Sequence, residues 1–307
     1  MKDVLKKWAA ARGYLITWSD STVVDEVHLE LERRRAAGEI DEYLYNRELN
    51  AFTYLNNAET PRPSTVFVLA VPRPAHLITF DIGSNTIEAV VPPTYLWYAE
   101  VRDRVRRELE AALPGRRCRL VNLSAPLKAL AARLGLVKYG RNNITYAPGL
   151  GSYHQLMAFL ADARLEPLAD PGINATQTSP ECEYCHACFS ACPTGAIGFK
   201  RFLLNGERCL TLYSEYSGPW PDWLPVSAHN CLVGCMICQK VCPRNTGLLR
   251  VEPSGVSFSE EETRVILDDS EDRSGPVWEA IRARLDAVGL ADYDRVIGRN
   301  LRALMAR

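Results

Sequence analysis

The sequence predicts an α+β protein in which a helix-flanked sheet precedes a small cysteine-rich module. Strand and helix patterns alternate over the first half of the chain, and nine of the ten cysteines lie between Cys182 and Cys242. A chain of 307 residues, 47% of them hydrophobic, can bury a large core. We expect a mixed α/β domain at 1–165, a cysteine-rich domain at 166–250 and a helical C-terminal extension at 251–307.

Helical periodicity and β-branched apolar runs alternate along the N-terminal part. The expected helices are Lys2–Ala11, Val23–Ala37, Thr94–Leu113 and Pro126–Leu134, and the expected strands are Thr65–Val71, Leu77–Ile82, Thr86–Val91, Cys118–Val121 and Gln155–Ala161. Pro114 and Gly115 should end the third helix. From Glu166 the stretch EPLADPGINATQTSPE has the composition of turns, which predicts a boundary before the cysteines.

The first residues, MKDVLKKWAAARGYLITW, contain neither a signal sequence nor an apolar run long enough to cross a bilayer. We therefore expect a cytoplasmic protein without a membrane partner, in which cysteines bind metals or carry redox chemistry rather than form disulfides. The net charge of −1 gives no overall case for nucleic-acid binding. Residues 111–161 contain no Asp or Glu, so this basic stretch is either a solvated face or a pocket for an anion.

The cysteine spacing indicates two iron–sulfur clusters of the 4Fe-4S type. The first run is C-x2-C-x2-C-x3-C-P and the second repeats its end as C-x2-C-x3-C-P. In two-cluster ferredoxins the last cysteine of a run binds the other cluster. Exchanging last ligands assigns Cys182, Cys185, Cys188 and Cys242 to one cluster, and Cys192, Cys235 and Cys238 to the other. This predicts a bacterial-ferredoxin-like two-cluster domain.

The second cluster lacks one ligand, for which Cys209 and Cys231 are the candidates. A strict copy of the first run would place it at Leu232, so Cys231 is one residue out of register. Spacing leaves both open, and we favour Cys209. A pair of zinc sites is the alternative for the whole set, but zinc sites rarely chain three cysteines at two-residue spacing and then add Cys-Pro. Two clusters form an electron relay, and the long N-terminal part should bind a cofactor, a substrate or both.

Three stretches resemble one family. They are the cysteine segments CEYCHACFSACPTGAI, RCLTLYSEYSGPWP and GCMICQKVCPRN in this order, the stretch LGLVKYGRNNITYAPGLGSYHQLMAFLADARLEP, and the strand ending in AVPRP. Together they resemble the cobalamin-dependent double-cluster reductases, that is epoxyqueuosine reductase and, more distantly, the corrinoid reductive dehalogenases. The resemblance covers about residues 66–245.

The resemblance implies a cobalamin bound base-off between the N-terminal domain and the cluster domain, with the nearer cluster passing electrons to the cobalt. It implies Cys209 as the last ligand of the second cluster. It also implies that the corrinoid is lined by Tyr139, Gly140, Arg141, Asn142 and Asn143, and by Thr211 from the cluster side. We expect an oxidoreductase that reduces an organic substrate and takes electrons from an external low-potential donor such as ferredoxin or flavodoxin.

The chain departs from the family at the expected proton donor, because Asn122 stands nearest to the position of an aspartate. An amide is no useful acid at neutral pH. Tyr139, Tyr146, Tyr153 or His154 could donate instead, although each is also explained as a core residue. The loss of the acid motivates an alternative, an electron-transfer or corrinoid-handling protein without substrate chemistry. A flavin has little support, since no Gly-rich phosphate loop is present.

The C-terminal part departs from the family as well. Full-length epoxyqueuosine reductases carry helical repeats that help to hold tRNA, whereas about sixty residues follow Asn245 here and several of them are acidic. A phosphate backbone is held by Lys and Arg. We therefore expect tRNA to be a possible but disfavoured substrate.

Overall fold

The computed structural model describes residues 1–55, 63–113, 118–168, 177–200, 202–268 and 273–306. The chain forms two compact units: unit 1 comprises Met1–Pro72, Glu100–His186 and Gly198–Glu207, and unit 2 comprises Arg73–Ala99, Ala187–Ile197 and Arg208–Arg307. These units interleave along the sequence, whereas the expected domains are consecutive, so the division at 165 and 250 stays a prediction. Within the described ranges, no helix is both long and apolar enough to cross a membrane.

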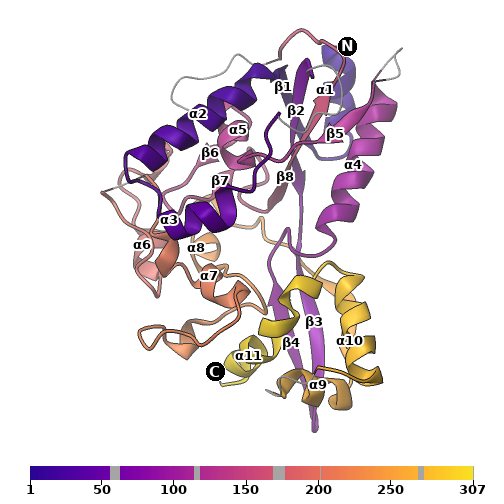
Figure 1. Cartoon of the computed structure of the whole chain (residues 1–307), viewed down its shortest axis with the longest axis vertical. Helices are drawn as coiled ribbons and strands as arrows, with labels where there is room; N and C mark the ends of the chain where they lie inside the picture. Colours follow the sequence, from indigo (N-terminus) through magenta and orange to yellow (C-terminus); the bar gives the residue numbers. More distant parts are fainter. Residues whose placement is uncertain (56–62, 114–117, 169–176, 201, 269–272, 307) are drawn as a thin grey trace. The chain divides into compact units, whose positions relative to one another are not determined.

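Unit 1 is built on a four-stranded antiparallel sheet with the order β1-β2-β8-β5 (Figure 1). The strands of this sheet are β1 (Leu15–Asp20), β2 (Thr65–Pro72), β8 (His154–Ala161) and β5 (Leu120–Asn122). Unit 1 also contains a separate hairpin formed by β6 (Lys138–Tyr139) and β7 (Thr145–Tyr146). Its helices are α1 (Lys2–Ala10), α2 (Thr22–Ala36), α3 (Glu42–Leu44), the π-helical turn η1 (Tyr45–Leu49), α4 (Tyr98–Ala112, from Glu100 on), α5 (Leu127–Arg133) and the 3-10 turn η2 (Pro180–Cys182).

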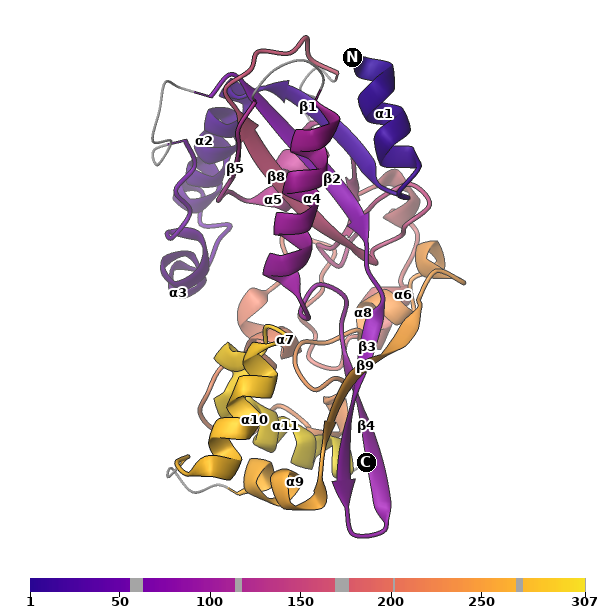
Figure 2. The ribbon, with the colours of Figure 1, turned by 90° about the vertical axis from the view of Figure 1, so that its right-hand side faces the viewer.

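Helices cover both faces of this sheet. Val66 and Val68 of β2 pack in one core cluster with Val23 of α2 and Leu130 of α5, while Phe67 points to the other face and is fully buried. Figure 2 shows α1 and α4 on that other face. Because both faces of β2 are covered, its sequence is a continuous apolar run rather than an alternating one.

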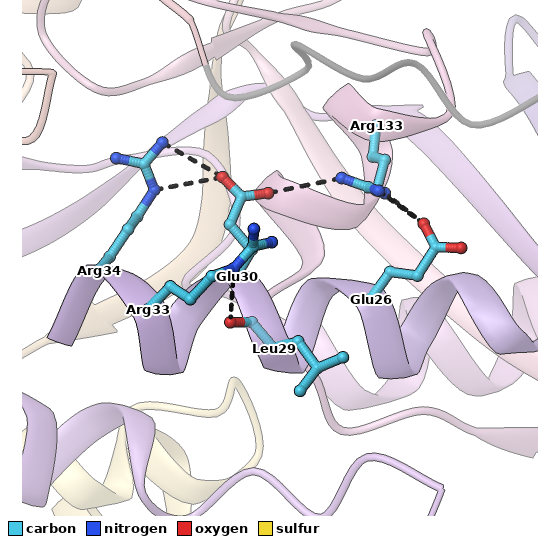
Figure 3. Close-up of polar contacts among 6 residues, drawn as sticks. All are labelled: Glu26, Leu29, Glu30, Arg33, Arg34 and Arg133. Carbon is cyan, nitrogen blue, oxygen red and sulfur yellow. Dashed lines mark hydrogen bonds and ion pairs between the residues drawn. The ribbon is translucent and has the colours of Figure 1, made fainter. Parts of the chain in front are cut away.

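A charged network joins α2 to α5 (Figure 3). The guanidinium of Arg133 donates to Glu26 Oε2 at 2.6 and 3.0 Å and lies 3.6 Å from Glu30. Glu30 also pairs with Arg34 at 3.2 Å. Arg133 belongs to the basic stretch 111–161. Its charge is balanced by carboxylates of α2, so it is not available to bind an anionic ligand.

Unit 2 contains a three-stranded sheet with the order β4-β3-β9. β3 pairs antiparallel with β4 and parallel with β9. The strands are β3 (Ala75–Ile82), β4 (Asn85–Val91) and β9 (Val251–Phe258), and the helices are α6 (Ala187–Ala191), α7 (Leu210–Glu215), α8 (Ile237–Lys240), α9 (Glu260–Leu267), α10 (Pro276–Asp286) and α11 (Asp294–Met305). Short turns are η3 (Gly206–Arg208, spanning both units), η4 (Val226–Ala228), η5 (Pro243–Asn245) and η6 (Ala291–Tyr293).

The core of unit 2 lies between this sheet and the C-terminal helices. Phe80 of β3 and Phe258 of β9 stack with ring centroids 5.2 Å apart, and Trp278, Ile281 and Leu301 complete the cluster. The expectation of a helical extension from residue 251 is wrong for 251–258, which form β9. Pairing with a strand far away in the sequence, not local periodicity, determines that conformation.

Most expected elements form with shifts of a few residues. The expected helix Thr94–Leu113 begins only at Tyr98, because Thr94 (φ 86°) and Trp97 (φ 52°) adopt left-handed conformations that a helix excludes. The strand predicted at Cys118–Val121 starts at Leu120, and β1 was not predicted. Pro114, Gly115 and half of the expected linker after Glu166 lie outside the described residues.

Candidate iron–sulfur and cofactor sites

Three thiols from three separate segments of unit 2 lie close enough to influence one another electrostatically. Cys192 follows α6, Cys209 is the N-cap of α7, and Cys235 precedes α8. Burial raises the pKa of Cys209 and of Cys235, and the charge of Cys192 raises both further. The charge of Cys235 likewise raises the pKa of Cys209. Spacing assigns Cys192 and Cys235 to the second cluster and leaves Cys209 as the favoured candidate for its missing ligand, and the electrostatic interactions among the three thiols agree with that choice.

Hydrogen-bond donors surround these sulfur atoms. Although burial opposes it, the hydroxyl and N–H of Thr194 and the N–H groups of Ala196 and Ile197 lower the pKa of Cys192. The N–H and hydroxyl of Thr211 act on Cys209 in the same direction. Such N–H···S contacts stabilise thiolates and tune cluster potentials. The donor set therefore fits a cluster. Among the described residues, no three His, Cys, Asp or Glu side chains gather so as to hold one metal ion.

Cys231 lies one side chain away from this group. It is fully buried, and its Sγ donates to Asn230 Oδ1 at 3.2 Å. Asn230 Nδ2 in turn donates to Cys235 Sγ at 3.1 Å. An amide thus separates Cys231 from Cys235, and this arrangement favours Cys209 as the fourth ligand. Nothing in the sequence marked Asn230, because a lone asparagine in a loop carries no spacing signal.

The first cysteine run begins in unit 1, where Arg141 holds it. Arg141 Nη2 donates to the carbonyl oxygen of Cys182 at 2.5 Å and to that of Glu183 at 3.2 Å. The guanidinium lies 4.0 Å from the ring centroid of Phe199. The resemblance implies that Arg141 lines a corrinoid. The structure places its head group on the backbone of a predicted cluster ligand.

The β6–β7 hairpin carries the other residues expected around the corrinoid. Gly140 admits no side chain, since a Cβ there would lie 2.6 Å from the Tyr146 ring and 2.7 Å from Asn142 Oδ1. Asn142 Nδ2 donates to Tyr146 Oη at 2.9 Å. Asn143 has φ 58°, and its buried Nδ2 has no partner among the described residues. An orphaned buried donor is costly and fits an acceptor on a ligand.

The structure separates the proton-donor candidates. Tyr139 lies in the core of unit 1, edge-on to Phe202, and burial raises its pKa. Tyr146 lies in the polar hairpin and is 1% exposed. His154 Nε2 is 3.5 Å from Thr145 Oγ1, and burial lowers the pKa of His154 to about 4. Asn122 is exposed on β5.

Residues 181–245 match the family model of the 4Fe-4S double cluster binding domain. The cysteine module therefore defines a protein with two 4Fe-4S clusters. The chain is similar to epoxyqueuosine reductases: it is 34% identical to that of Staphylococcus aureus over 121 residues, which are 39% of this chain and 30% of the relative. It is 30% identical to that of Pseudomonas aeruginosa over 184 residues, 58% of this chain and 46% of the relative.

Solved structures show the same fold. The epoxyqueuosine reductase from Streptococcus thermophilus matches 100% of this chain with 81% of its own, with a TM-score of 0.68 and 17% identity. The enzyme from Bacillus subtilis matches 99% of this chain with 80% of its own, with a TM-score of 0.61 and 19% identity. The predicted α+β fold and the resemblance are confirmed. The matches span less than half the length of these curated relatives.

Proposed function

We propose that this chain is an iron–sulfur and cobalamin-dependent reductase whose two clusters deliver electrons to a base-off corrinoid that reduces an organic substrate. The observation that carries the proposal is the convergence of Cys192, Cys209 and Cys235, each supplied with hydrogen-bond donors. Cys238 completes this set, and Cys182, Cys185, Cys188 and Cys242 hold the other cluster. The similarity to epoxyqueuosine reductases supports this reading.

The β6–β7 hairpin is the proposed corrinoid wall. Cobalamin would supply a low-valent metal centre able to reduce carbon bound to oxygen or halogen. Its amide-rich edge offers acceptors to the orphaned Nδ2 of Asn143. Gly140 keeps the backbone of the turn in place by leaving room for Tyr146. Tyr139 and Arg141 contribute by supporting this wall, since their side chains have partners elsewhere in unit 1.

Tyr146 is the proposed proton donor. It is a phenol in the hairpin, and its oxygen accepts a hydrogen bond from Asn142. That bond stabilises the phenolate left after proton transfer. Residues 111–161 contain no carboxylic acid, so a phenol replaces the aspartate that the resemblance leads us to expect. Asn122 takes no part in this scheme.

The test is anaerobic reconstitution with iron, sulfide and hydroxocobalamin. Tight binding should be visible as co-elution in gel filtration and as the base-off absorption band. Gly140→Ala should weaken corrinoid binding at least about tenfold, because the hairpin must move. Gly198→Ala is the matched control, since a Cβ there meets nothing within 4 Å. A protein that takes up both clusters but no corrinoid would contradict the proposal.

The substrate defines a second experiment. A solved epoxyqueuosine reductase holds an epoxyqueuosine-modified tRNA stem loop, whereas the acidic stretch between Glu260 and Asp272 of this chain disfavours a phosphate backbone. We propose an organic substrate other than tRNA. Reductant consumption should be compared with epoxyqueuosine tRNA and with haloorganic compounds, and turnover with the tRNA alone would refute this choice.

The second candidate function is an electron-transfer or corrinoid-handling protein without substrate chemistry. The lack of any carboxylic acid in 111–161 favours it. An external donor such as ferredoxin or flavodoxin would then reduce the clusters, and reduced corrinoid would pass to another enzyme. Turnover of any substrate by the purified chain excludes this candidate.

A further inference from the structure

Asn300 on α11 connects two segments that carry proposed ligands of the second cluster. Its side chain is fully buried. Its Nδ2 donates to the carbonyl oxygen of Ser214 at 2.7 Å and to that of Leu232 at 2.9 Å. Ser214 lies on α7, the helix that begins directly after Cys209, and Leu232 comes three residues before Cys235. One amide group thus ties the Cys209 helix to the Cys235 loop.

Ser214 forms a second tie between the same segments. Its Oγ accepts from the N–H of Gly234 at 2.8 Å and donates to the carbonyl oxygen of Thr211 at 2.9 Å. Arg299, next to Asn300, donates to the carbonyl oxygen of Tyr213 at 2.5 Å. Hydrogen bonds from α11 therefore reach α7 at two successive residues, and Ser214 extends the connection to the residue before Cys235.

α11 is itself fixed in unit 2. Gly298 allows close packing on α9, because a Cβ there would lie 2.0 Å from the carbonyl oxygen of Ile266. Arg302 donates to the carbonyl oxygen of Leu267 at 2.5 Å. The helix has no cysteine and supplies no ligand. Its buried polar side chain satisfies backbone carbonyls that would otherwise be orphaned.

We infer that α11 is a positioning element of the second cluster, and that Asn300 is the positioning residue that holds the Cys209 helix against the Cys235 loop. The inference rests on the proposed assignment of Cys209 and Cys235 to one cluster. Loss of the amide leaves two buried carbonyls without a donor and loosens the spacing between two ligands. The second cluster becomes labile, whereas the first does not, because none of its proposed ligands lies at the start of α7 or in the loop that ends at Cys235.

The test compares Asn300→Leu with Arg302→Met in the reconstituted full-length protein. Leucine has the same branched arrangement of heavy atoms as asparagine but donates no hydrogen bond, and the control removes a bond of the same helix that reaches α9 instead. Iron release to a chelator should become biphasic in Asn300→Leu. Half of the iron should leave about tenfold or more faster than in the wild type, and the other half should leave at the wild-type rate.

Electron paramagnetic resonance of the reduced protein provides a readout that general destabilisation would not change. In Asn300→Leu the signal of one cluster should shift and the coupling between clusters weaken, while Arg302→Met keeps the wild-type spectrum. Ser214→Ala, a milder change, should show the same selectivity if Asn300→Leu does not fold. Uniform acceleration of iron release, or none, overturns the inference alone. A wild-type chain that takes up no iron overturns the proposed function with it.

Discussion

At the scale of single residues, the sequence predicts the thiols but not their polar neighbours. The spacing of Cys192 and Cys235 follows a rule of cluster loops, so these residues could be named in advance. Asn230 and Asn143 stand out only through the positions of their side-chain amides. The amide of Asn230 donates to Cys235 Sγ, and that of Asn143 is buried without a partner among the described residues. Such contacts depend on loops that meet only after folding, and no local pattern encodes them.

The proposed proton donor leads to a prediction at this scale. Tyr146→Phe should lower turnover about a hundredfold or more, because it removes the acidic proton and leaves the ring in place. Tyr139→Phe is the control, since that phenol is buried in the core against Phe202. The measurement is single-turnover substrate reduction with the corrinoid reduced beforehand. Wild-type turnover in Tyr146→Phe would exclude Tyr146 as the proton donor.

His154 predicts a pH dependence of stability. Its pKa in the folded protein is about 4, lowered by burial, and about 6.5 in the unfolded chain. The unfolded state therefore binds more protons between these values, and stability is lost as the pH falls from about 6.5 towards 4. The loss amounts to at most about 3 kcal/mol. In urea unfolding at several pH values, the free energy of unfolding should depend less steeply on pH in His154→Gln than in the wild type; an unchanged dependence would contradict the prediction.

At the scale of elements, strands with strong local patterns could be predicted and others could not. β2 is apolar throughout because helices cover both of its faces. β9 is mostly exposed and contains Pro253 and Gly255, so it lacks a strand pattern and forms by pairing with β3. The start of α4 was missed because left-handed residues at Thr94 and Trp97 leave no sequence signal.

The arrangement around α7 and α8 predicts which cysteine completes the second cluster. Cys209→Ser should remove the iron of one cluster, because the Cys209 thiol interacts electrostatically with Cys192 and Cys235. Cys231→Ser should retain both clusters, since the Cys231 thiol faces Asn230. Iron and acid-labile sulfide per chain, measured after anaerobic reconstitution, distinguish the two. The opposite pattern would assign Cys231 as the ligand.

At the scale of the whole molecule, the division into units could not be predicted. Each unit collects segments that are far apart in the sequence. Composition distinguishes only the cysteine-rich stretch and does not indicate which segments fold together. The tail after residue 250 belongs to unit 2, where Phe258, Trp278 and Leu301 form part of the core. The tail is therefore structural rather than an appendage.

Truncation tests this conclusion. A chain ending at Leu249 should be insoluble or lack stable clusters, because Ile78, Phe80 and Val91 lose the residues that cover them. A chain ending at Met305, the last residue of α11, should behave as the full-length protein. Soluble yield and iron content provide the measurement. A stable, iron-containing protein ending at Leu249 would show that the tail is dispensable.

The parallel pairing of β3 with β9 has a consequence for biosynthesis. β3 leaves the ribosome early, but its partner, at Val251–Phe258, emerges after all ten cysteines have been synthesised. The nascent chain therefore exposes its thiols before the framework around several of them can close. We therefore expect stable cluster assembly only after the C-terminal segment has been synthesised, and until then a reducing environment or a chaperone would protect the thiols against oxidation.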